Sequence, residues 1–450
     1  MSLPPTLLVA RESLRALAQG ALLLPRGVGY LARREQHRKE VCRALEAACP
    51  GLELPPPAPL PRRLSVFLSA AERSGEIHAV NLARELRSAA RQRGVEQLEL
   101  VGLGGRALAE AGVQLIGTPV DRAQMGLSGI SASLSYWLGL VRKVAAEWQA
   151  RPPHVFVPVD SPALHVPLAR IAKGEGARVV HFVAPQYWGW APWRVGAYRR
   201  CIDRALTILP FEPDWYTAHG VRHAHVGHPL LDEIAAVPGT RAKDNTGLLV
   251  LLPGSRRSVI ERNLPWMLAR ARCLPARETA VLVPDQAAAE QCERITGQNA
   301  STVGIVQGRL HEHLARAQLA FSVSGTILTD VLHHRLPCVV LYRMGSAREA
   351  FLSRHFLTVP WFASINLLAN REVLPEFGFH GVGPVSACEE ALQRLWSNPK
   401  ARADVIAGLD RAAERLGPPG ACARAAQWVL NEAADAPREG PRARTRDVFS

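Results

Sequence analysis

The stretch Val155-Phe156-Val157-Pro158-Val159-Asp160-Ser161-Pro162 joins a nearly continuous apolar run to an abrupt polar turn. Such a run is typical of a strand buried on both faces, as in a parallel sheet covered by helices. The polar turn would then lie at the carboxyl end of the strand, where open α/β sheets bind their ligands. This stretch therefore predicts an α/β fold with a polar site at Asp160.

Similar apolar runs recur in two series, separated by helix-sized amphipathic stretches. The first series predicts strands at 64–68, 98–103, 155–159, 178–183 and 205–209, and the second at 248–252, 279–283, 319–323 and 338–342. A break near 235–245 separates the two series. We therefore predict two facing Rossmann-like, doubly wound domains with a ligand-binding cleft between them.

The two ends of the chain differ from this body. Residues 1 to about 50 carry apolar side chains at helical spacing, and 52–63 hold five prolines, which is typical of a linker. The predicted division is a helical extension with its linker (1–63), a first domain (64–235), a second domain (236–430) and a basic tail (431–450).

Composition excludes several classes of protein. The 450 residues are 48% hydrophobic and 21% charged, as in ordinary globular proteins, and their number suits two domains. The eight cysteines form no C-x-x-C pair, so we expect reduced, mostly buried thiols and no structural zinc site. No apolar run is long enough to span a bilayer and the start is a poor secretory signal, so a cytoplasmic protein is expected.

The net charge of +14 favours anionic partners in general: nucleic acid, phosphorylated substrates or a membrane surface. Charge alone does not choose between them. The N-terminal helix combines apolar and cationic residues, which leaves two interpretations open. It either attaches to a membrane surface or packs on the first domain.

In the first domain, polar and aromatic residues follow the predicted strands. Asp160 is either a general base or an ordinary helix N-cap. The loop 69–76 offers backbone N–H groups at a helix start. Trp188 and Trp190 either stack on a sugar or fill the space between the domains. His228 is either a proton shuttle or a structural histidine in a turn.

In the second domain, the turn Pro253-Gly254-Ser255-Arg256 offers a guanidinium and N–H donors suited to a diphosphate. Ser324-Gly325-Thr326 offers a second cradle, with Ser324 as a plain N-cap as the alternative. Asp330 could hold ribose hydroxyls. The sequence contains neither a P-loop motif nor the spaced dinucleotide-binding fingerprint.

Eleven segments, taken in order, resemble the lipid-A-disaccharide synthase family of GT-B-fold glycosyltransferases. The resemblance covers about 64–430. The segments are AAERSGEIHA from Ala70, VGLGG from Val101, MGLSGI from Met125, FVPVDSP from Phe156, HFVAPQYWGWAPWRV from His181, LPFEPDWY from Leu209, VGHPL from Val226, LLPGSRRSVI from Leu251, SGT from Ser324, YRM from Tyr342 and NLLANREVLPEF from Asn366.

The resemblance implies an inverting transfer of 2,3-diacylglucosamine from UDP to 2,3-diacylglucosamine 1-phosphate, with no metal or other cofactor. It also implies a role for each group of site residues. Asp160 would be the base, with Glu72, Arg256 and Asn366 also required for catalysis. UDP would contact Gly254, Ser255, Arg256, Ser324, Gly325, Thr326 and Asp330. The lipid acceptor would contact Ser74, Gly75, Met125, Trp188, Trp190 and His228.

The implied partners are the lipid and UDP-sugar substrates and the anionic inner-membrane surface, bound peripherally. Nucleic acid is not expected, and a homodimer is left open. Two alternatives remain. One is another GT-B enzyme acting on UDP-amino sugars, namely an epimerase or a peptidoglycan-precursor transferase. The other is a silent paralogue that binds lipids or UDP-sugars, because Ala163 replaces the second acid of the family's D-A-P-D.

Overall fold

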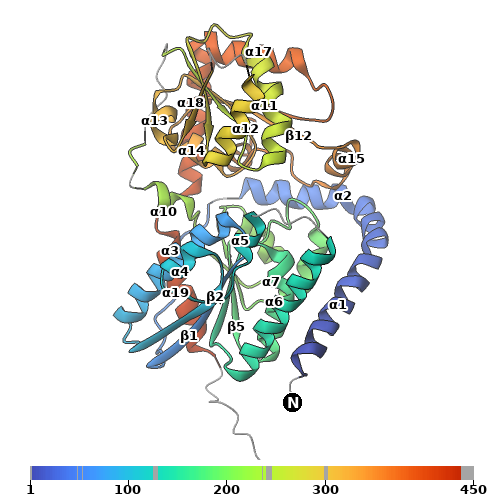
Figure 1. Cartoon of the computed structure of the whole chain (residues 1–450), viewed down its shortest axis with the longest axis vertical. Helices are drawn as coiled ribbons and strands as arrows, with labels where there is room; N and C mark the ends of the chain where they lie inside the picture. Colours follow the sequence, from blue (N-terminus) through green and yellow to red (C-terminus); the bar gives the residue numbers. More distant parts are fainter. Residues whose placement is uncertain are drawn as a thin grey trace, which may run out of the picture.

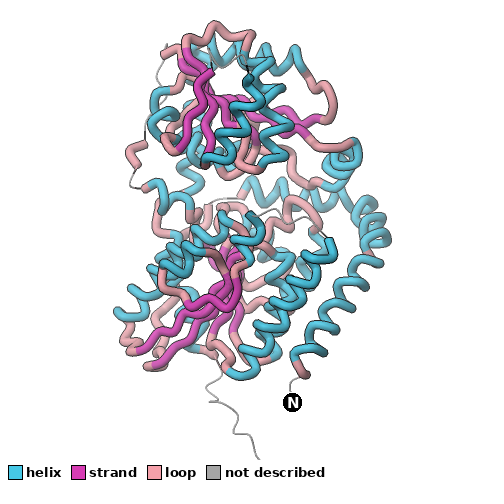
Figure 2. Tube along the Cα trace, viewed as in Figure 1, coloured by secondary structure: helices cyan, strands magenta, loops and turns pink. Residues whose placement is uncertain are grey.

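A computed structural model describes residues 3–47, 49–52, 54–124, 130–235, 237–239, 246–297 and 303–436. Two parallel sheets, each covered by helices, form the two halves of the molecule (Figure 1). The tube in Figure 2 shows the strands of each half gathered into one layer between helices. This arrangement confirms the predicted pair of Rossmann-like domains.

The first sheet has seven parallel strands in the order β3-β2-β1-β4-β5-β6-β7. Its strands are β1 (Arg63–Ala70), β2 (Gln97–Leu103), β3 (Gln114–Gly117), β4 (Val155–Val159), β5 (Arg178–Phe182), β6 (Arg204–Thr207) and β7 (His223–His225). Its helices are α3 (Arg73–Gln92), α4 (Arg106–Glu110), α5 (Pro119–Gln124), α6 (Ile130–Ala150), α7 (Pro162–Gly174), α8 (Val195–Arg199), α9 (Glu212–Ala218) and α10 (Leu230–Ile234), with a 3₁₀ turn η1 (Pro192–Arg194).

Both faces of this sheet are buried, as continuous apolar strands predict. Along β4, Val155 and Val157 belong to the apolar core that includes α3, whereas Phe156 packs against Trp148 of α6. Alternate side chains of one strand thus enter two separate cores, because successive residues of a strand point to opposite faces.

The second sheet has six parallel strands in the order β10-β9-β8-β11-β12-β13. The strands are β8 (Leu248–Leu252), β9 (Glu278–Val283), β10 (Val303–Gln307), β11 (Leu319–Val323), β12 (Cys338–Arg343) and β13 (Glu376–Phe379). The helices are α11 (Arg257–Ala271), α12 (Gln286–Thr296), α13 (Leu310–Arg316), α14 (Ile327–His333), α15 (Ala347–Phe356), α16 (Ser364–Ala369), α17 (Val385–Ser397) and α18 (Pro399–Leu416).

The last helix, α19 (Ala421–Ala434), returns to the first domain (Figure 1). Its apolar side chains, among them Ala425 and Val429, belong to the core that contains α3. Arg204 at the start of β6 donates to Glu432 over 2.5 Å. The predicted second domain ended at residue 430, whereas this packing assigns α19 to the first domain.

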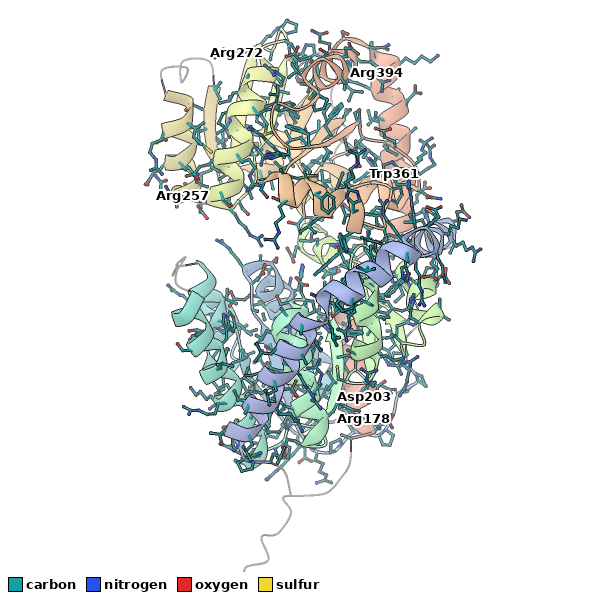
Figure 3. The ribbon with its side chains drawn as sticks, turned by 90° about the vertical axis from the view of Figure 1, so that its right-hand side faces the viewer. Arg178, Asp203, Arg257, Arg272, Trp361 and Arg394 are labelled. Atoms are coloured by element: carbon teal, nitrogen blue, oxygen red, sulfur yellow. The ribbon has the colours of Figure 1, made fainter. Side chains whose placement is uncertain are left out.

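The N-terminal extension forms two helices, α1 (Pro5–Ala21) and α2 (Leu23–Glu46). Leu8 of α1 is buried in the core that includes α6. In α2, Tyr30 donates to the carbonyl of Phe356 at the end of α15, over 2.8 Å. The extension therefore packs on the first domain and also reaches the second, and Figure 3 shows both helices along this side of the molecule.

All eight cysteines are free, and five of them are buried, as the sequence predicts. Among the helices described, none is both long and apolar enough to cross a membrane.

Candidate active site between the two domains

The loops that follow β1 and β8 meet between the two domains. Arg256 Nη2 donates to Glu72 Oε2 over 3.0 Å, and Arg73 Nη1 lies 3.8 Å from Asp285 Oδ2. Both pairs join the first domain to the second. They bring the carboxyl ends of the two sheets together, where α/β folds bind their ligands. We call this region the interdomain site. The ligand-binding cleft that the sequence predicts between the domains is not tested by these contacts and stays a prediction.

The start of α3 lies directly against the end of β4. A Cβ atom at Gly75 would be 3.4 Å from the carbonyl oxygen of Val159 and 3.9 Å from the Cβ of Asp160. Gly75 is buried in this contact, whereas Glu72 at the N-cap of α3 and Arg73 and Ser74 in its first turn are exposed. The small residue lets the helix N-terminus approach Asp160 closely.

Asp160 has a left-handed backbone, with φ 54°, an uncommon conformation for a residue other than glycine. Its carbonyl oxygen lies 2.6 Å from His165 Nδ1 and 3.0 Å from His181 Nε2. Burial lowers the pKa of His165 to about 4 and that of His181 to about 3, so both rings are neutral and donate one proton each. The N-cap of α7 is Ser161, so the structure does not support the N-cap alternative for Asp160.

The carboxyl group of Asp160 is suited to accept a proton. Burial raises its pKa, and the nearby negative charge of Glu72 raises it further, while the backbone N–H of Ser161 and the charge of His78 act in the opposite direction. A raised pKa makes the carboxylate a stronger base near neutral pH. Position and electrostatics thus both favour the predicted role.

A second group of titratable side chains lies near this carboxylate, since the charge of His78 acts on Asp160. His78 of α3 is 3.0 Å from Glu233 of α10, measured from Nδ1 to Oε1. Burial and the charge of His78 lower the pKa of His228 to about 3, and His228 Nδ1 accepts the N–H of Leu230 over 3.3 Å. A neutral ring with this local contact favours the structural interpretation of His228 over the proton shuttle.

The second domain contributes the turn before α11. Gly254 has φ 104°, and a Cβ atom there would lie 2.8 Å from Val259 Cγ1, so the turn requires glycine. Ser255 and Arg256 are exposed, and α11 begins at Arg257. Figure 3 shows Arg257 at the edge of the second domain that faces the first. A 15-residue helix starting here presents unpaired N–H groups suited to phosphate.

The Ser324-Gly325-Thr326 turn follows β11. Ser324 Oγ donates to the carbonyl of Phe362 over 3.0 Å, and the N-cap of α14 is Thr326. The N-cap alternative for Ser324 is therefore wrong. Gly325 and Thr326 are exposed and remain available to a ligand.

Asp330 is largely buried on α14. Burial and the charge of Glu233 raise its pKa to about 6. His311 Nε2 lies 3.8 Å from Asp330 Oδ1, and His311 Nδ1 lies 3.1 Å from His334 Nε2. Within the described ranges, no group of three or more such side chains could hold a metal ion.

Asn366 lies away from the surface. It is fully buried, its amide nitrogen donates to Leu374 O and Glu376 Oε2, and its amide oxygen accepts from the N–H groups of Val373 and Leu374. Because every hydrogen-bonding group is used, direct contact with substrate is excluded in this structure. The catalytic role implied by the resemblance becomes a positioning role for the loop after α16.

The loop 184–194, which we call the aromatic loop, joins the two domains through its backbone. Trp188 is buried, and its Nε1 donates to Glu212 Oε1 over 3.0 Å. Thr358 of the second domain bonds to the carbonyls of Trp188 and Gly189. Trp190 is 46% exposed and does not fill the space between the domains, and the buried ring of Trp188 packs against Phe211 of the first domain, with 4.8 Å between the ring centroids.

Met125 lies outside the described residues. The sequence did not indicate His78, His165 and Glu233 as members of the site. His78 could have been found, because it lies in the segment from Ala70 that resembles the family. No sequence pattern points to His165 or Glu233, because only the folded chain brings them close to Asp160 and His78.

The chain is similar to known proteins of one family. The family model described as lipid-A-disaccharide synthetase matches residues 66–415. The chain is 33% identical over 377 residues to a lipid-A-disaccharide synthase of Myxococcus xanthus, covering 81% of this chain and 96% of the relative. It is 31% identical over 380 residues to the Syntrophus aciditrophicus enzyme of the same name, covering 81% and 97%.

Solved structures share the fold at low identity. A glycotransferase of kitacinnamycin superposes with a TM-score of 0.52 at 16% identity, covering 83% of this chain and 100% of that one. A UDP-GlcNAc 2-epimerase from Neisseria meningitidis gives a TM-score of 0.50 at 9% identity, covering 82% and 98%. These likenesses show the GT-B type of fold alone. From the family match and its relatives, this chain belongs to the lipid-A-disaccharide synthase family of glycosyltransferases.

Proposed function

We propose that the interdomain site carries out the family reaction with Asp160 as the general base. Asp160 removes the proton from the 6-hydroxyl of 2,3-diacylglucosamine 1-phosphate, and that oxygen attacks C1 of UDP-2,3-diacylglucosamine. The bond from C1 to the phosphate oxygen breaks, and UDP leaves with the electron pair. The observation that carries this proposal is the partly buried carboxyl group of Asp160, which follows β4 directly, lies close to the start of α3 and has a pKa raised by burial.

The departing diphosphate needs compensating charge. Arg256 and the start of α11 supply a guanidinium and N–H donors, Gly325 and Thr326 provide a second set of donors, and Asp330 is the candidate for the ribose. The Glu72–Arg256 contact supports this assignment because it brings Arg256 to the same region as Asp160. The proposal needs no metal, so a chelator is expected to leave turnover unchanged.

Replacing Arg256 tests the donor site. Removing one charge-stabilising donor typically costs about 10²–10³ in kcat, and we expect Arg256→Gln to lose a comparable factor. Arg257→Gln is the matched control, because Arg257 is the next residue and pairs with Glu261 on its own helix over 2.9 Å. Equal, small losses in both variants would remove Arg256 from the proposal.

Peripheral attachment to an anionic membrane is the second part of the proposal. The observation that favours it is a set of exposed apolar side chains on the extension and on α15. They are Leu7, Leu14, Leu17, Val28, Leu31, Phe351 and Leu352. Deleting residues 1–60 is expected to abolish sedimentation with anionic vesicles, and unchanged sedimentation would refute attachment through the extension. A homodimer stays a prediction, and the molar mass measured by light scattering would test it.

A further inference from the structure

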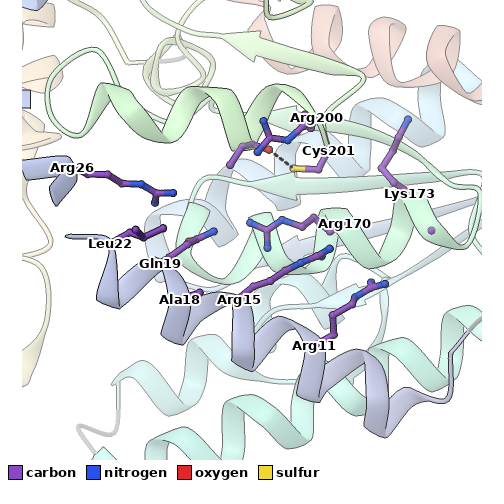
Figure 4. A pocket seen from close by; sticks show the side chains of 12 residues that line it. Arg11, Arg15, Ala18, Gln19, Leu22, Arg26, Arg170, Lys173, Arg200 and Cys201 are labelled. Atoms are coloured by element: carbon purple, nitrogen blue, oxygen red, sulfur yellow. Dashed lines mark hydrogen bonds between the residues drawn. The ribbon is translucent and has the colours of Figure 1, made fainter. Parts of the chain in front are cut away.

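A basic pocket lies between the N-terminal extension and the first domain, apart from the interdomain site. Its volume is about 540 Å³, and Figure 4 shows α1 and the start of α2 on one side with α7 and α8 on the other. The extension precedes residue 66, where the match to the family model begins. Half of the residues that line this pocket therefore belong to a segment outside the match to the family model.

Positive charge dominates the pocket. Both walls contribute equally, three cations from the extension and three from the first domain. The six are Arg11, Arg15, Arg26, Arg170, Lys173 and Arg200. A phosphate group pairs well with guanidinium groups, which offer directional donors as well as charge.

The acidic groups nearby do not balance these cations. Glu12 is buried and accepts from Arg15 and Arg170, over 2.6 Å in each case, while Arg11 Nε lies 3.5 Å from the same carboxylate. One negative charge thus faces three guanidinium groups. An anion in the pocket would relieve the remaining repulsion.

Two further arginines line the pocket. For Arg26 and Arg200, no side-chain hydrogen bond or ion pair is present within the part of the chain that the structure describes. Lys173 is paired with Asp203 over 2.7 Å, but Asp203 is shared with Arg178. Arg26 and Arg200 are therefore free to bind a ligand.

Helix α1, which carries two of these six cations, Arg11 and Arg15, also exposes leucines. Leu7, Leu14 and Leu17 are 52%, 67% and 71% exposed, and at 100° per residue their stripe lies beside that of Arg11 and Arg15. An exposed apolar stripe next to a cationic one is the pattern of a helix that lies in a membrane interface. The pocket would then open near the lipid headgroups.

We propose that the basic pocket binds the phosphate of an anionic membrane lipid while the leucines of α1 enter the interface. Arg26 and Arg200 contact the phosphate oxygens, and the Glu12 network holds the other guanidinium groups in place. This inference rests on the proposed membrane attachment and gives it a specific headgroup site. It is independent of the reaction at Asp160.

The test compares two double variants of the full-length protein. Arg26→Gln/Arg200→Gln removes the unpaired pocket charges, whereas Arg91→Gln/Lys400→Gln removes two exposed charges on α3 and α18. Sedimentation is measured with phosphatidylcholine vesicles with and without phosphatidylglycerol. One cation near an anionic surface contributes about 1 kcal/mol, so the pocket variant should bind the anionic vesicles about thirtyfold more weakly. The control variant should bind like the unmodified protein.

If both double variants lost the same amount of vesicle binding, the proposed phosphate site in the pocket would be wrong, because positive charge anywhere on the surface would then be enough for binding. Calorimetry with inorganic phosphate shows whether the ligand is a lipid headgroup or a soluble phosphate. If the pocket variant loses phosphate binding but sediments normally with vesicles, a soluble phosphate is the ligand and the lipid assignment is wrong. Turnover of detergent-dispersed substrates should be unchanged in the pocket variant, so failure of the catalytic proposal would be seen separately.

Discussion

At the scale of single residues, Asp160 depends on its backbone as well as on its burial. A left-handed conformation costs about 1–3 kcal/mol and persists only where surrounding contacts hold it. His165 and His181 supply those contacts through the Asp160 carbonyl. The sequence predicted Asp160 from its place after an apolar run, but the histidines come from α7 and from the neighbouring strand β5.

Asn366 shows the limit of prediction from residue type. It and Asp160 are both polar residues in segments that resemble the family, and the resemblance gave both a catalytic role. The two residues differ in burial: Asn366 has no exposed surface, whereas Asp160 is only partly buried. Which polar group faces a ligand depends on side-chain packing, which no local pattern records.

Replacing Asp160 by asparagine should separate activity from stability. A general base typically contributes 10²–10⁴-fold, so Asp160→Asn should lower kcat by about that factor. Its free energy of unfolding at pH 7 should not fall, because the folded state disfavours a carboxylate whose pKa is raised. Steady-state kinetics and urea denaturation measure the two quantities. A loss of stability that matches the loss of activity would indicate a structural role.

Replacing Glu72 should shift the pH profile. Glu72 raises the pKa of Asp160, so its neutral variant Glu72→Gln should move the acidic limb of kcat/KM to lower pH. The direction follows because removing a neighbouring negative charge favours the ionised base. Arg256→Gln is the comparison, since it removes the partner of Glu72 but leaves that charge in place. An acidic limb that stays fixed in Glu72→Gln would show that another group titrates.

At the scale of elements, the sequence predicted the interior strands and missed those at the sheet edges. The four strands absent from the prediction are β3, β7, β10 and β13, and each ends a sheet. An edge strand is covered less completely, so it lacks a continuous apolar run; β10 contains no fully buried residue. The edge strands were missed for a physical reason, since a continuous apolar run indicates only strands that are buried on both faces.

Gly102 tests the packing of β1 against β2. A Cβ atom at Gly102 would lie 1.9 Å from the carbonyl oxygen of Leu68, its partner in the register of the two strands. Gly102→Ala must therefore push β1 and β2 apart, and we expect a loss of about 4 kcal/mol or more in the free energy of unfolding. Gly139→Ala on α6, where no atom lies within 4 Å, is the control and should be neutral or gain up to about 1 kcal/mol. Similar free energies of unfolding for the two variants would show that β1 and β2 can separate at little cost.

At the scale of the whole molecule, several contacts connect the domains. Among them are the Glu72–Arg256 and Arg73–Asp285 pairs, the aromatic loop with Thr358, and the extension helix α2. The sequence predicted two domains and a helical extension. It could not predict that α2 reaches the second domain, because that contact joins residues 326 positions apart.

The hydrogen bond of Tyr30 tests this long-range contact. Tyr30 is buried and bonds to the Phe356 carbonyl, so Tyr30→Phe should lower the free energy of unfolding by about 1 kcal/mol. Gln36→Ala, which removes an exposed contact within α2, should change it by less than about 0.5 kcal/mol. Indistinguishable denaturation midpoints for both variants would mean that α2 detaches from the second domain in solution.

The formation of disaccharide tests the central claim most directly. The purified protein is incubated with UDP-2,3-diacylglucosamine and 2,3-diacylglucosamine 1-phosphate in several acyl-chain lengths, and the products are followed by mass spectrometry. We predict equal amounts of lipid A disaccharide 1-phosphate and UDP from the unmodified chain, and at least about a hundredfold slower formation by Asp160→Asn. Absence of disaccharide at every acyl length, or full activity of Asp160→Asn, would contradict the account.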